Sequence, residues 1–400
     1  MSSLPRSARL DHVDAMRAVA VILVMWTHYA ELYAHIAGSQ FALDGVQRSI
    51  NFGRIGVVIF FGISGMLIPS SLHGSPLGGA WRFVIRRVCR LYPAFWLSLP
   101  IGYAAYWLLS GNRLPVADLL ANLTMVPTAL GHVAVMPHYW TLETELVFYV
   151  LCLALHLSGG LHRMCNLCLI CLGLCAAFAI ASAWKLIPAD ALGQYRGMPY
   201  HLAIMFWGAC FRQAYDAPFA SVRFGLPGAA MSMSNREAFS IVTTAVVGIA
   251  ALMAAVDLYR QDPVHVAASL GYLFGIVAFL LLATVLRIQA RSFAWLGEIS
   301  YSVYLLHGVP LYLLYGFCKS HGLTGGPLAL YMALTVPPAL ALSWASHRLV
   351  ETAGIRAGHR LTDGGARSLR RPATGAAAAA STAVASGGTA RPAPIGGDDA

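Results

Sequence analysis

Residues 17–30 read RAVAVILVMWTHYA, an apolar run that begins with an arginine and carries a histidine near its end. Because Arg17 and His28 lie eleven residues apart, close to three helical turns, both side chains share one face of a helix. At about 1.5 Å of rise per residue, His28 lies roughly 16 Å beyond Arg17. If Arg17 marks the membrane edge, His28 lies near the middle of a hydrocarbon core about 30 Å thick. An ionisable group at that depth is costly, and it therefore indicates a functional site.

The composition of the whole chain is typical of an integral membrane protein. Of its 400 residues, 58% are hydrophobic and only 11% are charged, whereas a soluble domain carries about 25% charged residues. Ten stretches contain no Asp, Glu, Lys or Arg, and most are long enough to cross a bilayer as a helix. The sequence therefore predicts an all-α integral membrane protein with about ten transmembrane helices. The predicted spans are 18–30, 55–81, 91–112, 146–162, 164–184, 197–211, 238–256, 264–286, 299–318 and 320–347.

The distribution of basic residues predicts the orientation of these spans. With both termini in the cytoplasm, 20 of the 27 Lys and Arg residues lie inside and 7 outside, as the positive-inside rule expects. The apolar segment 114–140 is predicted to be external or re-entrant, because counting it as a span would reverse this bias. The net charge of +10 therefore indicates orientation and contact with anionic lipid, and it does not favour nucleic-acid binding.

The chain is predicted to consist of a membrane domain at 1–355 and a cytoplasmic tail at 361–400. The tail is rich in Ala, Gly, Pro, Ser and Arg, a composition that cannot bury a core and that predicts disorder. No stretch is left for a soluble catalytic domain, so chemistry is expected in or at the membrane. The first span lacks a clear cleavage site and is expected to stay in the membrane.

The cysteines at positions 165, 168, 171 and 175 have the spacing of a ferredoxin cluster. They lie in an uncharged predicted helix without a following proline, which favours ordinary packing of small apolar side chains. No metal site and no disulfide framework are predicted.

Four further patterns place polar side chains inside or beside predicted spans. FFGISG at 60–65 is rich in small residues, which also let helices pack closely. RRVCR at 86–90 fits the topology, although arginine also suits phosphate. WTLETE at 140–145 puts carboxylates beside a span, where solvation or pairing is needed. ISYSVYLLH at 299–307 holds a second intramembrane histidine, for which a structural role is the simpler explanation. The candidate residues from these patterns are Ser64, Arg87, Arg90, Glu145, Tyr301 and His307.

Together these patterns resemble the acyltransferase 3 family of multi-pass membrane O-acyltransferases, which includes O-antigen acetylases. The resemblance rests on Arg17 and His28 with ten residues between them, and on five later elements that follow in the family's order. Departures are Met66 where Phe is usual, Thr141 for Ser, and Thr-Ala at 352–353 for Arg-Pro or Lys-Pro. The later elements are 60–68, Arg87-x-x-Arg90 with Tyr92-Pro93, 140–149 with Glu145, 296–307, and the closing 349–351.

This resemblance implies transfer of an acyl group, usually acetyl from acetyl-CoA, to a hydroxyl of a carbohydrate or glycolipid acceptor. Acyl-CoA is then a co-substrate, no permanently bound cofactor is expected, and the location is a bacterial-type cytoplasmic (inner) membrane. CoA would meet Arg87 and Arg90 on the cytoplasmic side, and the acceptor would lie outside near Glu145. The implied catalytic residues are His28 and Glu145, and the implied donor- or substrate-binding residues are Arg17, Arg87, Arg90, Ser64, Tyr301 and His307.

Our hypothesis from the sequence is that His28 acts as a general base on the acceptor hydroxyl, since imidazole titrates near physiological pH. Positioned general-base catalysis contributes roughly 10²–10⁴-fold. An acyl-histidine intermediate is a competing route. A proton-coupled transporter or exporter, with His28 and Glu145 as relay groups, is the alternative function, and a purely structural His28 is a third interpretation.

Overall fold

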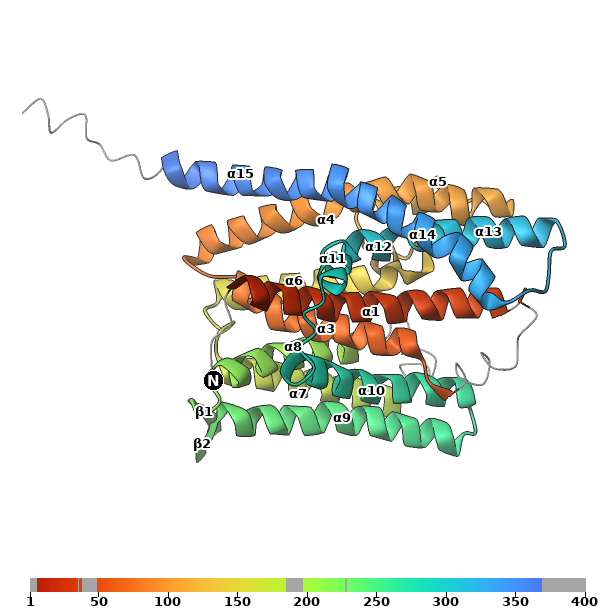
Figure 1. Ribbon diagram of the computed structural model, residues 1–400. Coiled ribbons are helices and arrows are strands. Elements are labelled where there is room, and N and C mark those ends of the chain that lie inside the picture. The colour runs from red at the N-terminus through yellow and green to blue at the C-terminus, as the bar shows by residue number, and fades with distance from the viewer. Residues whose placement is uncertain (1–5, 35, 38–48, 185–196, 227–228, 369–400) are drawn as a thin grey trace, which may run out of the picture.

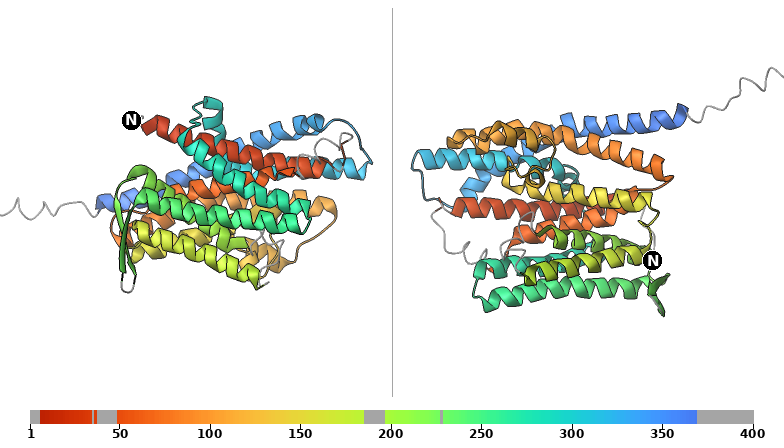
Figure 2. Two further views of the ribbon diagram at one scale, coloured as in Figure 1. Left: turned by 90° about the horizontal axis from the view of Figure 1, so that it is seen from below. Right: turned by 180° about the vertical axis from the view of Figure 1, so that it is seen from behind.

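The structure is a computed structural model that describes residues 6–34, 36–37, 49–184, 197–226 and 229–368. Long helices run side by side in one bundle, as Figures 1 and 2 show. In the described part of the chain, a two-stranded hairpin (β1, Ser221–Leu226; β2, Ala229–Ser234) is the only interruption of the all-α fold. The longer helices are α1 (Arg6–Ala34), α3 (Phe52–Ser71), α4 (Pro76–Tyr106), α6 (Trp140–Leu157), α7 (Met164–Ala183), α8 (Met198–Asp216), α9 (Asn235–Tyr259), α10 (Pro263–Thr284), α13 (Gly308–Ser320), α14 (Leu328–Ser346) and α15 (Thr352–Ser368).

The bundle has two distinct ends. The hairpin, the N-terminal end of α1, the start of α4 and the last turns of α15 lie at one of them in every view (Figures 1 and 2). We call this the hairpin end and the other the far end. The strands are antiparallel, with Ser221 opposite Ser234 and Leu226 opposite Ala229. A capping box between Ser234 and Glu237 then starts α9 directly after the hairpin.

Seven helical segments in the described residues are long and apolar enough to cross a membrane. This supports an all-α membrane protein, whereas the count of ten spans and the side of the termini stay predictions. Helix α4 carries four arginines, and α12 (Ser300–Leu306) and α13 are each short. The seven segments are His12–Ala34, Phe52–Ser71, Pro137–Leu157, Met164–Ala183, Asn235–Tyr259, Pro263–Thr284 and Leu328–Asp363.

Helix α3 lies at the centre of the bundle and packs against α1, α8 and α10. Its glycines allow this approach, because a Cβ on Gly65 would overlap the Met205 carbonyl of α8. Likewise, a Cβ on Gly62 would overlap the ring of Phe279 in α10. The small residues of FFGISG therefore do serve close packing, while Ser64 of the same stretch faces a cavity.

Two predicted spans each cover parts of two separate helices in the structure. The predicted span 55–81 ends early, since α3 stops at Ser71 and α4 begins at Pro76. Gly74 has a positive φ of 94° between them, and a proline at the first turn favours a helix start. The predicted span 299–318 is divided between α12 and α13 at His307. Pro310 explains the break, because it cannot donate to the carbonyl of residue 306.

Segment 114–140 forms no long helix, in agreement with its prediction as a non-spanning segment. It holds α5 (Val116–Asn122) and two 3-10 turns, η2 (Thr128–Leu130) and η3 (Pro137–Tyr139), before α6 begins. The Asn122 side chain ties the segment together, since it accepts from the Val135 amide at 2.9 Å and donates to the Val133 carbonyl at 2.8 Å. The segment therefore has a defined conformation beside the bundle, although it forms no long helix.

The predicted tail boundary at residue 361 is wrong, because α15 continues as a helix to Ser368. Helix α15 packs along α4, where Arg86 donates to Thr362 Oγ1 at 2.9 Å and pairs with Asp363 at 2.7 Å. The composition of this segment does not predict a helix, because the helix is stabilised by its contact with α4. The rest of the predicted disordered tail, 369–400, lies outside the described residues.

The cysteine run lies on the continuous helix α7, as the packing interpretation predicts. Cys171 Sγ donates to the Ala203 carbonyl of α8 at 3.3 Å, and Cys168 Sγ lies 3.8 Å from Cys210 Sγ. These side chains fill the interface between α7 and α8.

Candidate active site

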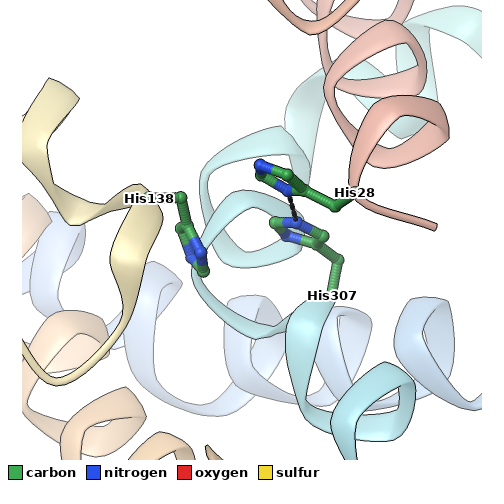
Figure 3. A group of neighbouring side chains, drawn as sticks. All are labelled: His28, His138 and His307. Carbon is green, nitrogen blue, oxygen red and sulfur yellow. Dashed lines mark hydrogen bonds between the residues drawn. The ribbon is translucent and has the colours of Figure 1, made fainter. Parts of the chain in front are cut away.

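Three histidines from distant parts of the chain meet inside the bundle (Figure 3). His28 comes from α1, His138 from η3, and His307 from the junction of α12 and α13. One ring nitrogen of each lies within 4.8 Å of one ring nitrogen of the others. The rings of His28 and His307 are stacked, with centroids 5.1 Å apart, and His138 lies tilted beside them.

The hydrogen bonds of His307 define the tautomer of His28. His307 Nδ1 lies 3.0 Å from the carbonyl oxygens of both Val303 and Tyr304. Because carbonyls only accept, this Nδ1 carries the proton, and Nε2 of the neutral ring has a free lone pair. His28 Nδ1 lies 2.8 Å from that Nε2 and must therefore be the donor. The remaining lone pair of His28 is on Nε2, which makes no hydrogen bond within the described residues.

His138 is a site residue that the sequence analysis missed. It is 5% exposed, and its Nε2 is buried without a hydrogen-bond partner among the described residues. Its carbonyl accepts a hydrogen bond from the Tyr304 hydroxyl. His138 lies outside the predicted spans and has no helical spacing to His28, which is why it was missed. The one signal in the sequence is that it lies two residues before Trp140, where the motif at 140–149 begins.

The candidate donor-binding residues gather around one cavity of about 120 Å³, which we call the arginine cavity. Five of the six predicted residues line it, and His307 does not, since it pairs with His28 instead. Glu145 lines the same cavity, beside the arginines, whereas the sequence analysis expected it near an outer acceptor. The five are Arg17, Ser64, Arg87, Arg90 and Tyr301.

The arginine cavity carries excess positive charge. Arg17 pairs with Asp14 at 2.5 Å, but within the described ranges neither Arg87 nor Arg90 pairs with a carboxylate. The Arg87 guanidinium lies over the rings of Phe83 and Tyr149, at 5.5 Å and 5.4 Å from their centroids. Arg90 Nε is buried with no hydrogen-bond partner in this part of the structure. An anionic ligand would accept hydrogen bonds from the guanidinium groups of both Arg87 and Arg90.

Glu145 is held by two hydroxyls of this cavity. Its Oε1 accepts from Ser64 Oγ at 3.1 Å and from the Tyr149 hydroxyl at 2.5 Å. No hydrogen bond connects it to His28 among the residues that the structure describes. The two predicted catalytic residues therefore belong to separate clusters, and a direct relay between them has no structural support.

A second, larger cavity of about 800 Å³ contains the histidine site, and we call it the histidine cavity. His28 and His138 line it together with polar and aromatic side chains. The Arg54 guanidinium lies 5.8 Å from the ring centroid of Trp140. The remaining lining includes Glu31, Asn51, Thr128 and Tyr312. Since Arg17 lies early in α1 and Glu31 near its end, the arginine cavity faces the hairpin end and the histidine cavity the far end.

The two cavities share Val57, Thr141 and Tyr304 as lining residues. Thr141 Oγ1 and the Tyr304 hydroxyl are 2.5 Å apart. Because the single Tyr304 proton is donated to the His138 carbonyl, Thr141 is the donor of this pair. These side chains form a partition between the two cavities.

Three histidine nitrogens are also a donor set that zinc accepts. In a tetrahedral site with Zn–N near 2.0–2.1 Å, two ligand nitrogens lie about 3.3 Å apart. The 2.8 Å between His28 Nδ1 and His307 Nε2 instead fits a shared proton. The geometry thus favours a hydrogen-bonded pair that leaves one lone pair free.

Two comparisons with known proteins found a match for this chain. The family model described as an acyltransferase domain, acyltransferase 3, matches residues 10–348. The chain is also 26% identical over 379 residues to a protein of Komagataeibacter xylinus described as "Putative membrane-bound transacylase BcsY", covering 88% of this chain and 84% of that protein. No solved structure matches the chain. The family match covers most of the described helices, including both cavities, and the chain therefore belongs to the acyltransferase 3 family of membrane acyltransferases.

Proposed function

We propose that this protein transfers an acetyl group from acetyl-CoA to a hydroxyl of a cell-surface or lipid-linked carbohydrate, with His28 as the general base. The observation that carries the proposal is the free Nε2 lone pair of His28, on a half-buried ring that lines the larger cavity. The donor would occupy the arginine cavity and the acceptor the histidine cavity, so that the two meet at Thr141 and Tyr304.

The reaction balances with the side chains present. As the acceptor oxygen attacks the thioester carbonyl carbon, its proton passes to His28 Nε2. The tetrahedral intermediate then collapses, the carbon–sulfur bond breaks, and the CoA thiolate takes that proton from His28. The products are the O-acetyl ester and free CoA thiol, and His28 is neutral again.

His307 is a positioning residue in this scheme. Its Nε2 accepts the Nδ1 proton of His28, which fixes the ring and stabilises the imidazolium that forms during attack. The carbonyls of Val303 and Tyr304 hold His307 in turn, and the helix break beside Pro310 places it there. Glu145 acts on the donor side, where it orients Ser64 and Tyr149.

The charges support one orientation of the protein in the membrane. CoA is a cytoplasmic molecule with several phosphates, and the unpaired Arg87 and Arg90 face the hairpin end. We therefore assign the hairpin end to the cytoplasm and the far end, with the larger polar cavity, to the acceptor side of a bacterial-type inner membrane.

The test combines a deletion strain with matched variants. A strain lacking the protein should lose an O-acetyl signal in NMR spectra of its surface glycans, and the wild-type chain should restore it. His28→Ala should insert at normal level without restoring the signal, while His321→Ala, at the exposed C-terminal end of α13, should restore it fully. Full O-acetylation with His28→Ala would disprove the proposed role of His28. If the deletion strain kept normal O-acetylation of its surface glycans, the proposed function would be disproved.

A further inference from the structure

A third cavity, of about 260 Å³, lies where the first turns of α4 meet α15 and the end of α3. We call it the α4–α15 pocket. Its basic lining residues are His73, Arg82, Arg86, Arg87, Arg90 and His359. Arg87 and Arg90 also line the arginine cavity, so the two spaces adjoin along one face of α4.

The charge of this pocket is largely uncompensated. Asp363 pairs with Arg86 at 2.7 Å and lies 3.8 Å from His359 Nδ1. Arg82 donates only to the carbonyls of His73 and Gly78, at 3.2 Å and 3.3 Å. In the described ranges Arg82, Arg87 and Arg90 all lack a carboxylate partner, and three guanidinium groups therefore face a space that can hold an anion. A ligand with several phosphate oxygens matches such a cluster.

The sequence of cavities matches the charge pattern of a CoA thioester. Such a donor carries its phosphates at the nucleotide end, and an uncharged arm leads from there to the reacting thioester. Along α4 the arginine-lined pocket is likewise followed by a smaller cavity with an apolar wall of Val57, Phe60 and Leu67. That cavity ends at the Thr141–Tyr304 partition, beside the histidines.

On the basis of the proposed function, we infer that the α4–α15 pocket binds the phosphorylated nucleotide end of the acyl-CoA donor. Arg82 and His359 contact the phosphates there, and Arg87 and Arg90 stand where the nucleotide joins the uncharged arm. Helix α15 is part of the donor site, because it supplies His359 and holds Arg86 through Thr362 and Asp363.

Kinetics with two different acetyl donors can distinguish a defect in this subsite from a defect in the reaction centre. Acetyl-CoA has the nucleotide end, whereas S-acetyl-N-acetylcysteamine is an acetyl thioester without it. Arg82→Gln and His359→Gln should each raise KM for acetyl-CoA about tenfold or more and leave kcat unchanged, since only binding remote from the thioester is lost. The kinetics of the truncated donor should stay unchanged, which also shows that the variants fold. Arg223 is an exposed arginine of the hairpin at the same end of the bundle. Arg223→Gln also removes one positive charge, and it should leave KM and kcat unchanged with both donors.

A binding measurement keeps this inference distinct from the proposed function. Adenosine 3′,5′-bisphosphate, the nucleotide end alone, should bind the purified wild-type protein and bind Arg82→Gln at least about tenfold more weakly, whether or not acetyl transfer is observed. If both donors lost activity equally, or neither changed, the subsite assignment would be wrong although the acyltransferase proposal could stand. Unchanged nucleotide binding with reduced retention of phosphatidylglycerol would overturn it in favour of a lipid headgroup.

Discussion

His28 Nδ1 lies 2.8 Å from His307 Nε2, and this contact leaves the Nε2 lone pair of His28 available at the histidine cavity. The two residues are 279 positions apart in the chain. The pair therefore links the first helix to the α12–α13 break, and it determines what chemistry the intramembrane histidine can perform.

Replacement of His307 should lower turnover without weakening substrate binding. His307→Leu removes the acceptor for His28 Nδ1–H, so the ring loses its fixed tautomer, and kcat should fall by about 10²-fold with little change in KM. His307→Gln keeps an oxygen acceptor near that position and should recover part of the loss. Steady-state kinetics in detergent or proteoliposomes check this. Equal activity loss in both variants would point to a structural role alone.

Initial-rate kinetics should show that donor and acceptor bind together. The two cavities share Val57, Thr141 and Tyr304, so both substrates can be present when attack begins. Double-reciprocal plots against both substrates should intersect, and quenching with labelled acetyl-CoA alone should leave no acetyl group on the protein. Parallel lines with a labelled histidine would instead support the acyl-histidine route.

Catalysis should not depend on a metal ion. The short nitrogen–nitrogen distance between His28 and His307 favours a shared proton over two zinc ligands. Protein treated with EDTA and shown metal-free by elemental analysis should keep full activity. Activity that disappears on chelation and returns with zinc would contradict the proposed tautomer and favour a three-histidine metal site.

The glycine contact between α3 and α8 should be essential for stability. Gly65→Ala places a methyl group against the Met205 carbonyl, and such overpacking costs about 1–3 kcal/mol. The thermal midpoint of the purified protein should fall. Gly173→Ala in α7 is the matched control, since nothing in the described structure lies within 4 Å of its added Cβ, and its midpoint should not fall. Equal midpoints for the two variants would refute this packing argument.

The membrane-protein class could be predicted because it depends on local composition. A run such as 238–256 is apolar over the whole thickness of a bilayer, and α9 covers it with a few residues to spare at each end. Element boundaries were harder wherever an apolar run crossed a turn. Within the apolar run 55–81 the first helix ends before Gly74 and the next begins at Pro76, and Pro310 divides the run 299–318 into two helices. Hydropathy hardly changes at these places.

Much of the arginine cavity also followed from motifs, since Arg87 and Arg90 lie one helical turn apart on α4. Residues on one element keep their spacing whatever the rest of the chain does. His138 could not be found in this way, because its approach to His28 depends on how segment 114–140 folds against the bundle.

The sequence by itself determined that the chain crosses a membrane, that His28 lies deep in the first helix, and which motifs it shares with acyltransferases. Only the tertiary structure decided that His28 is paired with His307 and that Glu145 faces the arginines. Periodicity and hydropathy report on a residue's own helix, whereas a hydrogen bond between distant helices exists only after packing has fixed their rotation and depth.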